Sequence, residues 1–455
     1  MKMRIVSVED GIDNVGFRKM SAYARRLNSD TDVYYVPTGN VRGLYRTITM
    51  HGTSRQDDRD VRRIAEELAD SDIVGFSSMT PYSDTVRKII GDIREINPKA
   101  FIVWGGIHAI IHPEDAILHA DAVCTGEGEF AFEQFYRAFC NGHDYSITPS
   151  FWFNVQGNVV KNINLPLQTA AEMDGLPYLI YQDGERIYRK GEGFVPIAVS
   201  DFVEFSGLAY NTVWSIGCPL KCTYCGNTKF IEYDKGYRRI RHSAVDYIVN
   251  EVKRAVAKHP HLSTIVFHDD SFMALPRKQL HEFAIKFKAE IGLPFAVFGV
   301  IPNYVEADKM EILLEAGLNR VRMGIQSGSE RILEFYKRPT PVPRIKESTE
   351  ILNRYRKFMI PPAYDIIVDC PVESRDDTLA TLDLIYEMPR PFTLNIHSLR
   401  VIPNTDLALD IKALGIDIEG IQSTYLAHIP SLGNALIYVL VLWRIPRSWY
   451  DRTGN

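Results

Sequence analysis

The sequence lacks three features that would place it in other classes of protein. Its longest apolar run, residues 435–443, is far shorter than the roughly 20 residues that a membrane-spanning helix needs. Lys and Arg number 52 against 57 Asp and Glu, so the net charge is −5 and no basic excess is available to hold a phosphate backbone. The first residues, MKMRIVSVED, contain neither the long apolar core nor the cleavage site of an export signal. We therefore expect a cytoplasmic protein without a nucleic-acid partner.

Cysteine is also scarce, with six residues in a chain of 455, which is too few for a disulfide framework. Three of the six nevertheless lie within a short stretch, as Cys218, Cys222 and Cys225. This distribution indicates a reducing compartment and a shared chemical role for the three thiols. The remaining cysteines lie in apolar segments and are interpreted as small buried hydrophobes: Cys124, Cys140 and Cys370.

The N-terminal third alternates short apolar strands with amphipathic helices. Residues 61–68 and 86–93 place apolar side chains at positions i, i+3, i+4 and i+7, which is typical of helices that offer one stripe to a sheet. Such alternation predicts parallel strands with crossover helices, hence a doubly wound α/β domain of the Rossmann or flavodoxin type over residues 1–145. Strands are expected at 3–8, 32–36, 73–76, 101–104 and 122–124.

The rest of the chain divides into three parts. Residues 146–206 lose the alternation and contain dispersed prolines, so they are predicted to be a linker with a small β element. Over residues 207–405 the alternation resumes and predicts a partial (β/α)6 barrel of the TIM type, with chemistry on the loops that follow the strands. Residues 406–455 form a C-terminal extension. The barrel strands are expected at 212–215, 264–268, 294–300, 320–325, 364–368 and 393–399.

The three clustered cysteines follow the first expected barrel strand with the spacing C-x3-C-x2-C. Three thiolates in a tight loop bind a metal, but a structural zinc requires a fourth ligand, and no Cys or His follows at finger-like spacing before His242. A [4Fe-4S] cluster with one open iron suits the set better. The spacing, with Tyr224 before the last cysteine, resembles that of the radical S-adenosylmethionine (SAM) superfamily.

Further segments resemble the same superfamily. Residues 268–272 follow the second strand, where members place groups that hold the methionine amine, although solvated carboxylates at a strand end would look the same. Residues 324–330 look like the family's G-x-E-S-G-S segment with Gln in place of Glu, and a Lys-Arg pair follows them. Residues 402–405 resemble the P-G-T element beside adenine, with Asn404 in place of Gly, and Asn tolerates a positive φ. The resemblance implies that SAM is bound by Tyr224, Asp269, Asp270, Gln326, Ser327 and Arg338.

The N-terminal domain carries G-G-x-H at 105–108, P-E at 113–114 and G-E-G-E at 126–129. It lacks G-x-G-x-x-G after the first strand, which argues against an NAD-type domain. The order of these segments ahead of the barrel resembles the cobalamin-binding domain of cobalamin-dependent radical SAM enzymes. The loop over residues 9–16 contains no His, so we expect base-off cobalamin without a histidine on cobalt; His108 is the rival ligand, although a turn histidine is more often a hydrogen-bonding anchor. The resemblance implies that cobalamin is bound by Ser77, Ser78, Thr80, Gly105, Gly106, His108, Gly126, Glu127 and Gly128.

The resemblance implies an enzyme that methylates an unactivated carbon through a 5'-deoxyadenosyl radical and methylcobalamin. Radical rearrangement or cyclisation with the same cofactors is the first alternative, and a non-catalytic cobalamin sensor is the second. A methylthiotransferase fits less well, because the N-terminal three-cysteine module of that class is absent. No motif identifies a catalytic acid or base. We expect a small-molecule, lipid or natural-product substrate and a reducing partner such as flavodoxin or ferredoxin.

The apolar run at 435–443 follows Gly433-Asn434 and precedes Arg444, Arg447 and Arg452. It predicts a helix packed on the barrel. An interfacial element is the alternative, because apolar area with cationic flanks favours anionic membrane surfaces and would give weak membrane association.

Overall fold

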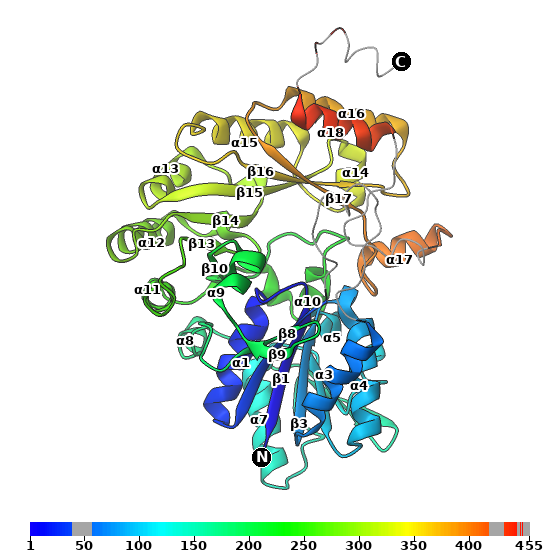
Figure 1. Ribbon diagram of the computed structural model, residues 1–455. Coiled ribbons are helices and arrows are strands. Elements are labelled where there is room, and N and C mark those ends of the chain that lie inside the picture. The colour runs from blue at the N-terminus through cyan, green and yellow to red at the C-terminus, as the bar shows by residue number, and fades with distance from the viewer. Residues whose placement is uncertain (39–56, 418–431, 444–445, 447, 449–455) are drawn as a thin grey trace. The chain divides into compact units, whose positions relative to one another are not determined.

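The computed structural model describes residues 1–38, 57–417, 432–443, 446 and 448 (Figure 1). The chain forms two compact units. The first comprises residues 1–211, 232–235 and 254–262, and the second comprises residues 212–231, 236–253 and 263–455. Arg444, Arg447 and Arg452, which flank the predicted tail helix, lie outside the described residues.

The first unit is built on a nine-stranded sheet in the order β7-β6-β5-β4-β3-β1-β2-β8-β9. Its parallel core has the order 2-1-3-4-5 of flavodoxin-like domains, as the alternation of strands and helices predicted. Ligands of such sheets bind at the carboxyl ends of the strands, next to the switch point between β1 and β3. The strands of this unit are β1 (Met3–Glu9), β2 (Thr31–Pro37), β3 (Ile73–Ser78), β4 (Phe101–Gly105), β5 (Ala122–Cys124), β6 (Phe151–Val155), β7 (Asn158–Lys161), β8 (Arg186–Arg189) and β9 (Gly193–Pro196).

Helices cover both faces of this sheet, and each face has its own apolar core. On one face α3 and α4 bury their predicted stripes, including Ile64 and Ile89, and on the other α1 and α7 bury Phe17 and Phe135. A capping box at Asp57 satisfies the first turn of α3. The helices are α1 (Val15–Leu27), α3 (Asp58–Ala69), α4 (Ser83–Ile96), α5 (Ile107–Ile111), α6 (Pro113–Ala116), α7 (Gly128–Cys140), α8 (Ala170–Asp174) and α9 (Val199–Asp201), with short η1 (Thr80–Tyr82) and η2 (Phe202–Ser206).

Residues 146–206 contain the predicted β element as four short strands, and they belong to the first compact unit, which continues to residue 211. β6 pairs antiparallel with β5 and with β7, while β8 pairs parallel with β2 and antiparallel with β9. The segment therefore supplies both edges of the first sheet. Its strands are only four or five residues long and close in tight hairpins, which leaves too few positions for a periodic pattern.

The second unit contains a six-stranded sheet in the order β10-β13-β14-β15-β16-β17, with parallel pairs from β13 to β17 (Figure 1). This is the predicted partial barrel; only its first strand lies a few residues earlier than expected. The strands are β10 (Ala209–Thr212), β11 (Ser215–Ile216), β12 (Arg241–His242), β13 (Thr264–Phe267), β14 (Phe295–Val300), β15 (Leu318–Gln326), β16 (Ala363–Val368) and β17 (Thr393–Ser398). The helices are α10 (Asn227–Tyr233), α11 (Val245–Lys258), α12 (Arg277–Glu290), α13 (Ala307–Glu315), α14 (Glu330–Phe335), α15 (Val342–Arg354), α16 (Arg375–Glu387), α17 (Asp406–Ala413) and α18 (Leu432–Leu442), with short η3 (Lys235–Arg238), η4 (Phe272–Ala274) and η5 (Pro302–Tyr304).

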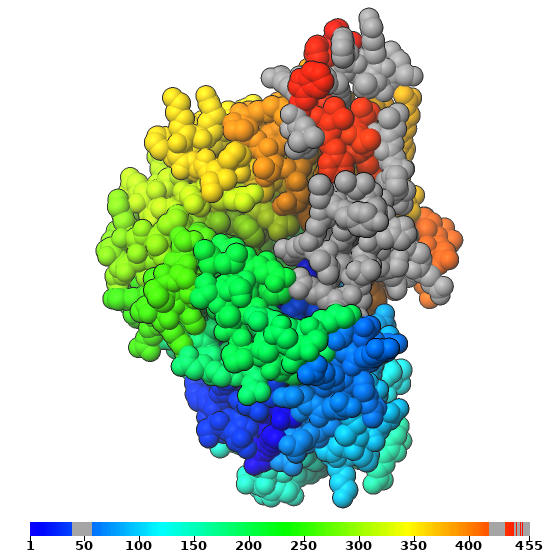
Figure 2. Space-filling model, viewed as in Figure 1, coloured from blue at the N-terminus to red at the C-terminus, as the bar shows by residue number. Residues whose placement is uncertain are grey.

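The tail helix α18 packs against α16, and Ile437 and Leu440 on its packed side are 1% exposed. The prediction of a helix packed on the barrel is confirmed at these residues. Tyr438, Val439 and Trp443 remain exposed, and α18 lies on the surface shown in Figure 2. None of the helices in the described ranges is long and apolar enough to cross a membrane.

The isolated cysteines divide between interior and surface. Cys124 and Cys370 are buried, as predicted. Cys140 is exposed, so its predicted burial is wrong. It is the last residue of α7, whose buried side chains end at Phe135.

Candidate functional site

The three clustered cysteines share one partly buried loop after β11. The Cys218 backbone N–H donates to the Tyr237 carbonyl, and that of Cys225 donates to the Cys222 carbonyl. The Thr228 hydroxyl caps the turn by donating to the Cys225 carbonyl at 2.9 Å. All three thiols are free. Backbone hydrogen bonds therefore hold the loop in place without a disulfide.

Two polar groups donate to sulfur. The Ser271 hydroxyl lies 3.4 Å from the Cys218 Sγ, and the Arg338 Nη1 lies 3.7 Å from the Cys222 Sγ. Burial raises the pKa of the Cys225 thiol to about 12, so that thiol is protonated at neutral pH unless a cation displaces the proton. Hydrogen-bond donors and a guanidinium beside sulfur stabilise thiolates, and this surrounding fits a bound metal cluster.

The spread of the sulfurs argues against a single zinc ion. With Zn–S bonds of about 2.3 Å, two ligating sulfurs lie roughly 4 Å apart. In the described part of the chain, the one set of three His, Cys, Asp or Glu side chains whose ligand atoms gather within 4.8 Å is His108, His112 and Asp115. The three cysteines are more widely spaced than one ion requires, which suits a polynuclear cluster.

The two acidic residues after β13, Asp269 and Asp270, both accept hydrogen bonds from other groups of the protein. Asp269 is 1% exposed and accepts from the backbone N–H groups of Trp214 at 3.0 Å and Ser215 at 2.7 Å. Burial raises its pKa to about 7 against the effect of these donors. Asp270 accepts from Tyr237 Oη at 2.9 Å and Asn227 Nδ2 at 3.0 Å. Asp269 thus supports the loop through these hydrogen bonds, and its contact with SAM stays a prediction.

Two predicted SAM residues differ in environment. Gln326 ends β15 with φ of 76°, and a side chain at Gly324 would come within 2.4 Å of its Nε2. Ser327 is 0% exposed, and its Oγ pairs with Thr381 Oγ1 and accepts from the Ser329 backbone N–H. Gln326 is thus placed at the strand end, whereas Ser327 fastens the segment to α16, and the contact of either residue with SAM stays a prediction.

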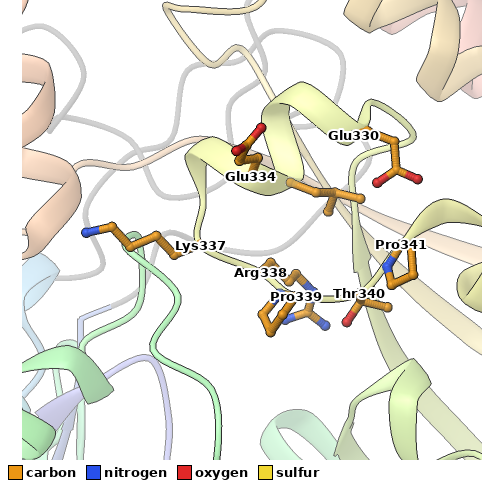
Figure 3. A pocket seen from close by; sticks show the side chains of 8 residues that line it. Glu330, Glu334, Lys337, Arg338, Pro339, Thr340 and Pro341 are labelled. Atoms are coloured by element: carbon orange, nitrogen blue, oxygen red, sulfur yellow. The ribbon is translucent and has the colours of Figure 1, made fainter.

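Arg338, in the segment that follows α14, is buried and contacts the cysteine loop. Its guanidinium donates to the Gly324 carbonyl at 2.5 Å and lies 3.3 Å from the Tyr224 hydroxyl, in addition to the Cys222 sulfur. It thereby joins the cysteine loop to the end of β15. Figure 3 shows a surface pocket in this segment, in which the Arg338 side chain lies beside Thr340 while Lys337 points away.

Asn404 adopts φ of 61°, which confirms the expectation that this position needs a residue tolerant of positive φ. The next residue, Thr405, is fully buried and caps α17 by accepting from the Ala408 backbone N–H at 3.3 Å. The segment therefore forms a tight turn at the carboxyl end of β17.

In the first unit, the predicted glycine turns lie at the carboxyl ends of β4 and β5, and the predicted Ser77, Ser78 and Thr80 lie at that of β3. Gly106 has φ of 84°, and a Cβ there would come within 2.7 Å of the Ser77 Oγ and 2.9 Å of the Ser78 backbone N. The Ser78 hydroxyl accepts from the Trp104 indole at 3.0 Å. Among the described residues, the buried Thr80 Oγ1 has no hydrogen-bond partner. A glycine cradle beside an unpaired hydroxyl fits the binding of a polar ligand group.

The loop after β1 has no imidazole. The Asn14 Nδ2 donates to the Glu9 Oε1 at 2.6 Å, and burial, with a smaller contribution from Asp10, raises the pKa of Glu9 to about 8. His108 is 1% exposed, and its Nε2 pairs with Asp115 at 2.9 Å. This contact makes His108 a hydrogen-bonding anchor of α5, in agreement with the interpretation of a turn histidine.

The G-E-G-E segment begins α7, and both of its carboxylates bind one residue that the sequence did not single out. The Gln168 backbone N–H donates to Glu127 at 2.7 Å, and its side-chain amide donates to Glu129 at 2.8 Å. Gln168 lies in the segment interpreted as a linker, and no local motif marks it. Gly105, Gly126 and Gly128 lie at the same edge of the sheet.

Two family models match successive parts of the chain. The B12 binding domain matches residues 41–136, and the radical SAM superfamily matches residues 212–385. The chain carries a radical SAM domain preceded by a B12-binding domain. The first model falls within the flavodoxin-like unit, and the second begins at the end of β10 and contains the cysteine loop.

Among curated proteins, the chain is 26% identical over 328 residues to an uncharacterized methyltransferase of Pyrococcus horikoshii, covering 71% of this chain and 65% of that protein. It is 22% identical over 329 residues to the anaerobic magnesium-protoporphyrin IX monomethyl ester cyclase of Rubrivivax gelatinosus, covering 70% and 54%. The chain thus spans between half and two thirds of the length of these relatives.

Among solved structures, the radical SAM methyltransferase TsrM of Kitasatospora setae, with cobalamin and a [4Fe-4S] cluster bound, aligns with a TM-score of 0.69 at 14% identity. The alignment covers 91% of this chain and 75% of TsrM. At this identity the match establishes the shared fold.

Proposed function

We propose that this protein is a cobalamin-dependent radical SAM methylase that transfers a methyl group to an unactivated carbon of a small molecule. The observation that carries the proposal is the cysteine loop with its two sulfur-directed donors, combined in one chain with a B12-binding domain. The curated methyltransferase relative and the TsrM fold support the same assignment.

When bound, the cluster with SAM supplies the deoxyadenosyl radical, and cobalamin carries the methyl group. Cys218, Cys222 and Cys225 would hold the cluster, with Ser271 and Arg338 donating to sulfur. The protein's own work is to bind, orient and exclude water.

The proposed contacts of SAM remain Tyr224, Asp269, Asp270, Gln326, Ser327 and Arg338. Gln326 keeps hydrogen-bonding capacity at the place where the family carries Glu. Arg338 is a candidate partner for the methionine carboxylate, because its guanidinium lies beside the cysteine whose cluster SAM would chelate.

The cobalamin contacts are proposed at the glycine turns, with Ser77, Ser78 and Thr80 around the nucleotide tail and no histidine on cobalt. Gly105, Gly106, Gly126, Glu127 and Gly128 complete the proposed set, while His108 would position α5. A flavodoxin or ferredoxin would deliver the electron. Membrane association through α18 and a lipid substrate remain predictions. The burial of Ile437 and Leu440 within the protein needs neither of them.

Radical cyclisation is the second candidate, because three relatives are named as cyclases. Analysis of the products formed from SAM separates the readings. The anaerobically reconstituted protein is incubated with SAM, a reductant and a small-molecule extract. A methylase forms both S-adenosylhomocysteine and 5'-deoxyadenosine, whereas a cyclase forms only the latter and a sensor forms neither. Absence of S-adenosylhomocysteine would contradict the methylase proposal.

A further inference from the structure

A row of polar and aromatic side chains crosses one face of the six-stranded sheet, and only its first member, His268, belongs to a motif described above. β15 shows the alternation: Val321 and Met323 are fully buried on one face, whereas the Arg322 side chain, on the other, is 32% exposed. Neighbouring strands place polar side chains next to it. This row, called the polar belt, consists of His268, Phe298, Arg322, Asp365, Asn395 and His397.

The belt holds its arginine in a fixed orientation. The Arg322 Nε donates to both carboxylate oxygens of Asp365, at 2.8 and 3.0 Å, and its Nη2 donates to the His397 Nε2 at 3.3 Å. The Asn395 amide also donates to Asp365, at 2.7 Å. The His397 Nε2 also lies 3.7 Å from the Asp365 Oδ1, so the imidazole packs against both members of the ion pair.

This arrangement leaves hydrogen-bonding capacity on the open face. Asp365 and His397 use the Nε side of the guanidinium, and among the described residues the Arg322 Nη1 has no hydrogen-bond partner. The side chains of Asp365 and His397 are 17% and 30% exposed, so the group is accessible. The Nη1 edge of the guanidinium is therefore open to a carboxylate, to which arginine donates charge-assisted hydrogen bonds.

An aromatic surface lies directly beside this edge. The Arg322 guanidinium is 5.5 Å from the centre of the Phe298 ring, and the His268 ring meets Phe298 edge-on at 5.0 Å. Phe298 is half-buried, and His268 is exposed. A flat ring placed against Phe298 would bury apolar area on both partners.

We propose that the polar belt is the substrate anchor of this protein and that it takes a planar, ring-containing carboxylate, with the carboxylate on the free edge of Arg322 and the ring against Phe298. The inference rests on the proposed function for its substrate, but the binding that it describes is independent of turnover. Asp365 keeps the guanidinium oriented, so that little conformational entropy is lost on binding.

The test uses a matched pair of probes, 1-naphthoate and its uncharged amide 1-naphthamide, titrated calorimetrically into the anaerobically reconstituted protein without reductant. Because a charge-assisted pair with arginine exceeds a neutral hydrogen bond, we expect naphthoate to bind about tenfold more tightly than the amide. The double variant Arg322→Gln/Asp365→Asn removes both charges without leaving an unpaired buried ion, and it should bind the two probes equally.

The control is Arg277→Gln/Asp308→Asn, which makes the same exchanges in an exposed ion pair at 2.6 Å and should keep the preference for naphthoate. SAM affinity should be the same in all three proteins. Three results would overturn the proposal: no preference for naphthoate in the wild type, a preserved preference in the belt variant, or a loss of SAM binding in that variant. The last result would place the belt in the SAM site. Failure of methyl transfer would leave these affinities unchanged, so the two proposals fail separately.

Discussion

The chemistry of the cysteine loop depends on single side chains that act on sulfur. Ser271 and Arg338 reach Cys218 and Cys222 from segments far apart in sequence, so the loop spacing alone could not reveal them. Both donors would favour the thiolate form that a cluster requires. These contacts therefore distinguish the ligating thiols from the other cysteines.

We expect Cys222→Ala to bind almost no iron or sulfide after anaerobic reconstitution, against about four of each in the wild type, because a thiolate ligand is lost. Cys140→Ala is the matched control, since Cys140 is exposed at the end of α7 and should leave the iron content unchanged. Iron and sulfide analysis with the visible absorption spectrum gives the readout. A full cluster in Cys222→Ala would refute the assignment of this ligand.

Glu9 makes stability depend on pH. Burial raises its pKa from 4.5 to about 8, so between these values the folded protein holds a proton that the unfolded chain has released, and stability falls as pH rises. Glu9→Gln does not titrate and keeps an acceptor for Asn14. The variant should gain stability relative to wild type from pH 4.5 to about 8, by at most about 1.4 kcal/mol per pH unit, and no more above it. Urea unfolding at several pH values measures this gain, and a difference independent of pH would exclude the mechanism.

At the scale of elements, the turn after β4 is the most constrained part of the first unit. Gly106→Ala must place a Cβ at positive φ and within 2.7 Å of the Ser77 Oγ, so we expect a loss of about 1–3 kcal/mol in unfolding free energy. Gly91→Ala in α4 meets nothing within 4 Å and should stabilise by roughly 0.5–1 kcal/mol. Comparing unfolding free energies and bound cobalamin in the two variants tests the cradle. Equal behaviour of both would show that the turn is unconstrained.

The tail helix α18 has a packed side and an exposed side. Leu440 is 1% exposed and Val439 is 41% exposed, so Leu440→Ala should lose about 2–5 kcal/mol of stability, while Val439→Ala should change it by less than about 0.5 kcal/mol. Thermal unfolding of the two variants checks the packing. A negligible effect of Leu440→Ala would mean that α18 does not dock as described.

Elements with long periodic patterns could be predicted from the sequence, and short ones could not. The parallel strands and the stripes of α3 and α4 follow from spacing alone, and the C-x3-C-x2-C loop was found because its ligands are local. The edge strands β6 to β9 were missed because each is four or five residues long. The burial of Asp269 and Ser327 could not be predicted from their local sequence, and Arg322 with Asp365 was missed because the pair forms only when β15 and β16 lie together.

At the scale of the whole molecule, each unit supplies a different part of the proposed chemistry. The flavodoxin-like unit carries the glycine cradle, and the partial barrel carries the cysteine loop and the polar belt. The chain spans only 65% of the methyltransferase that it matches. The proposal for its substrate class therefore rests on the side chains of the polar belt and not on that relative.

The most direct test of the central claim follows the methyl group itself. The protein, reconstituted anaerobically with iron, sulfide and cobalamin, is incubated with SAM that carries a deuterated methyl group and a reductant, and the extracted corrinoid is analysed by mass spectrometry. We predict that the labelled methyl group is found on the corrinoid of the wild-type protein. A corrinoid without label, in a protein that holds both its cluster and its cobalamin, would contradict the assignment as a methylase.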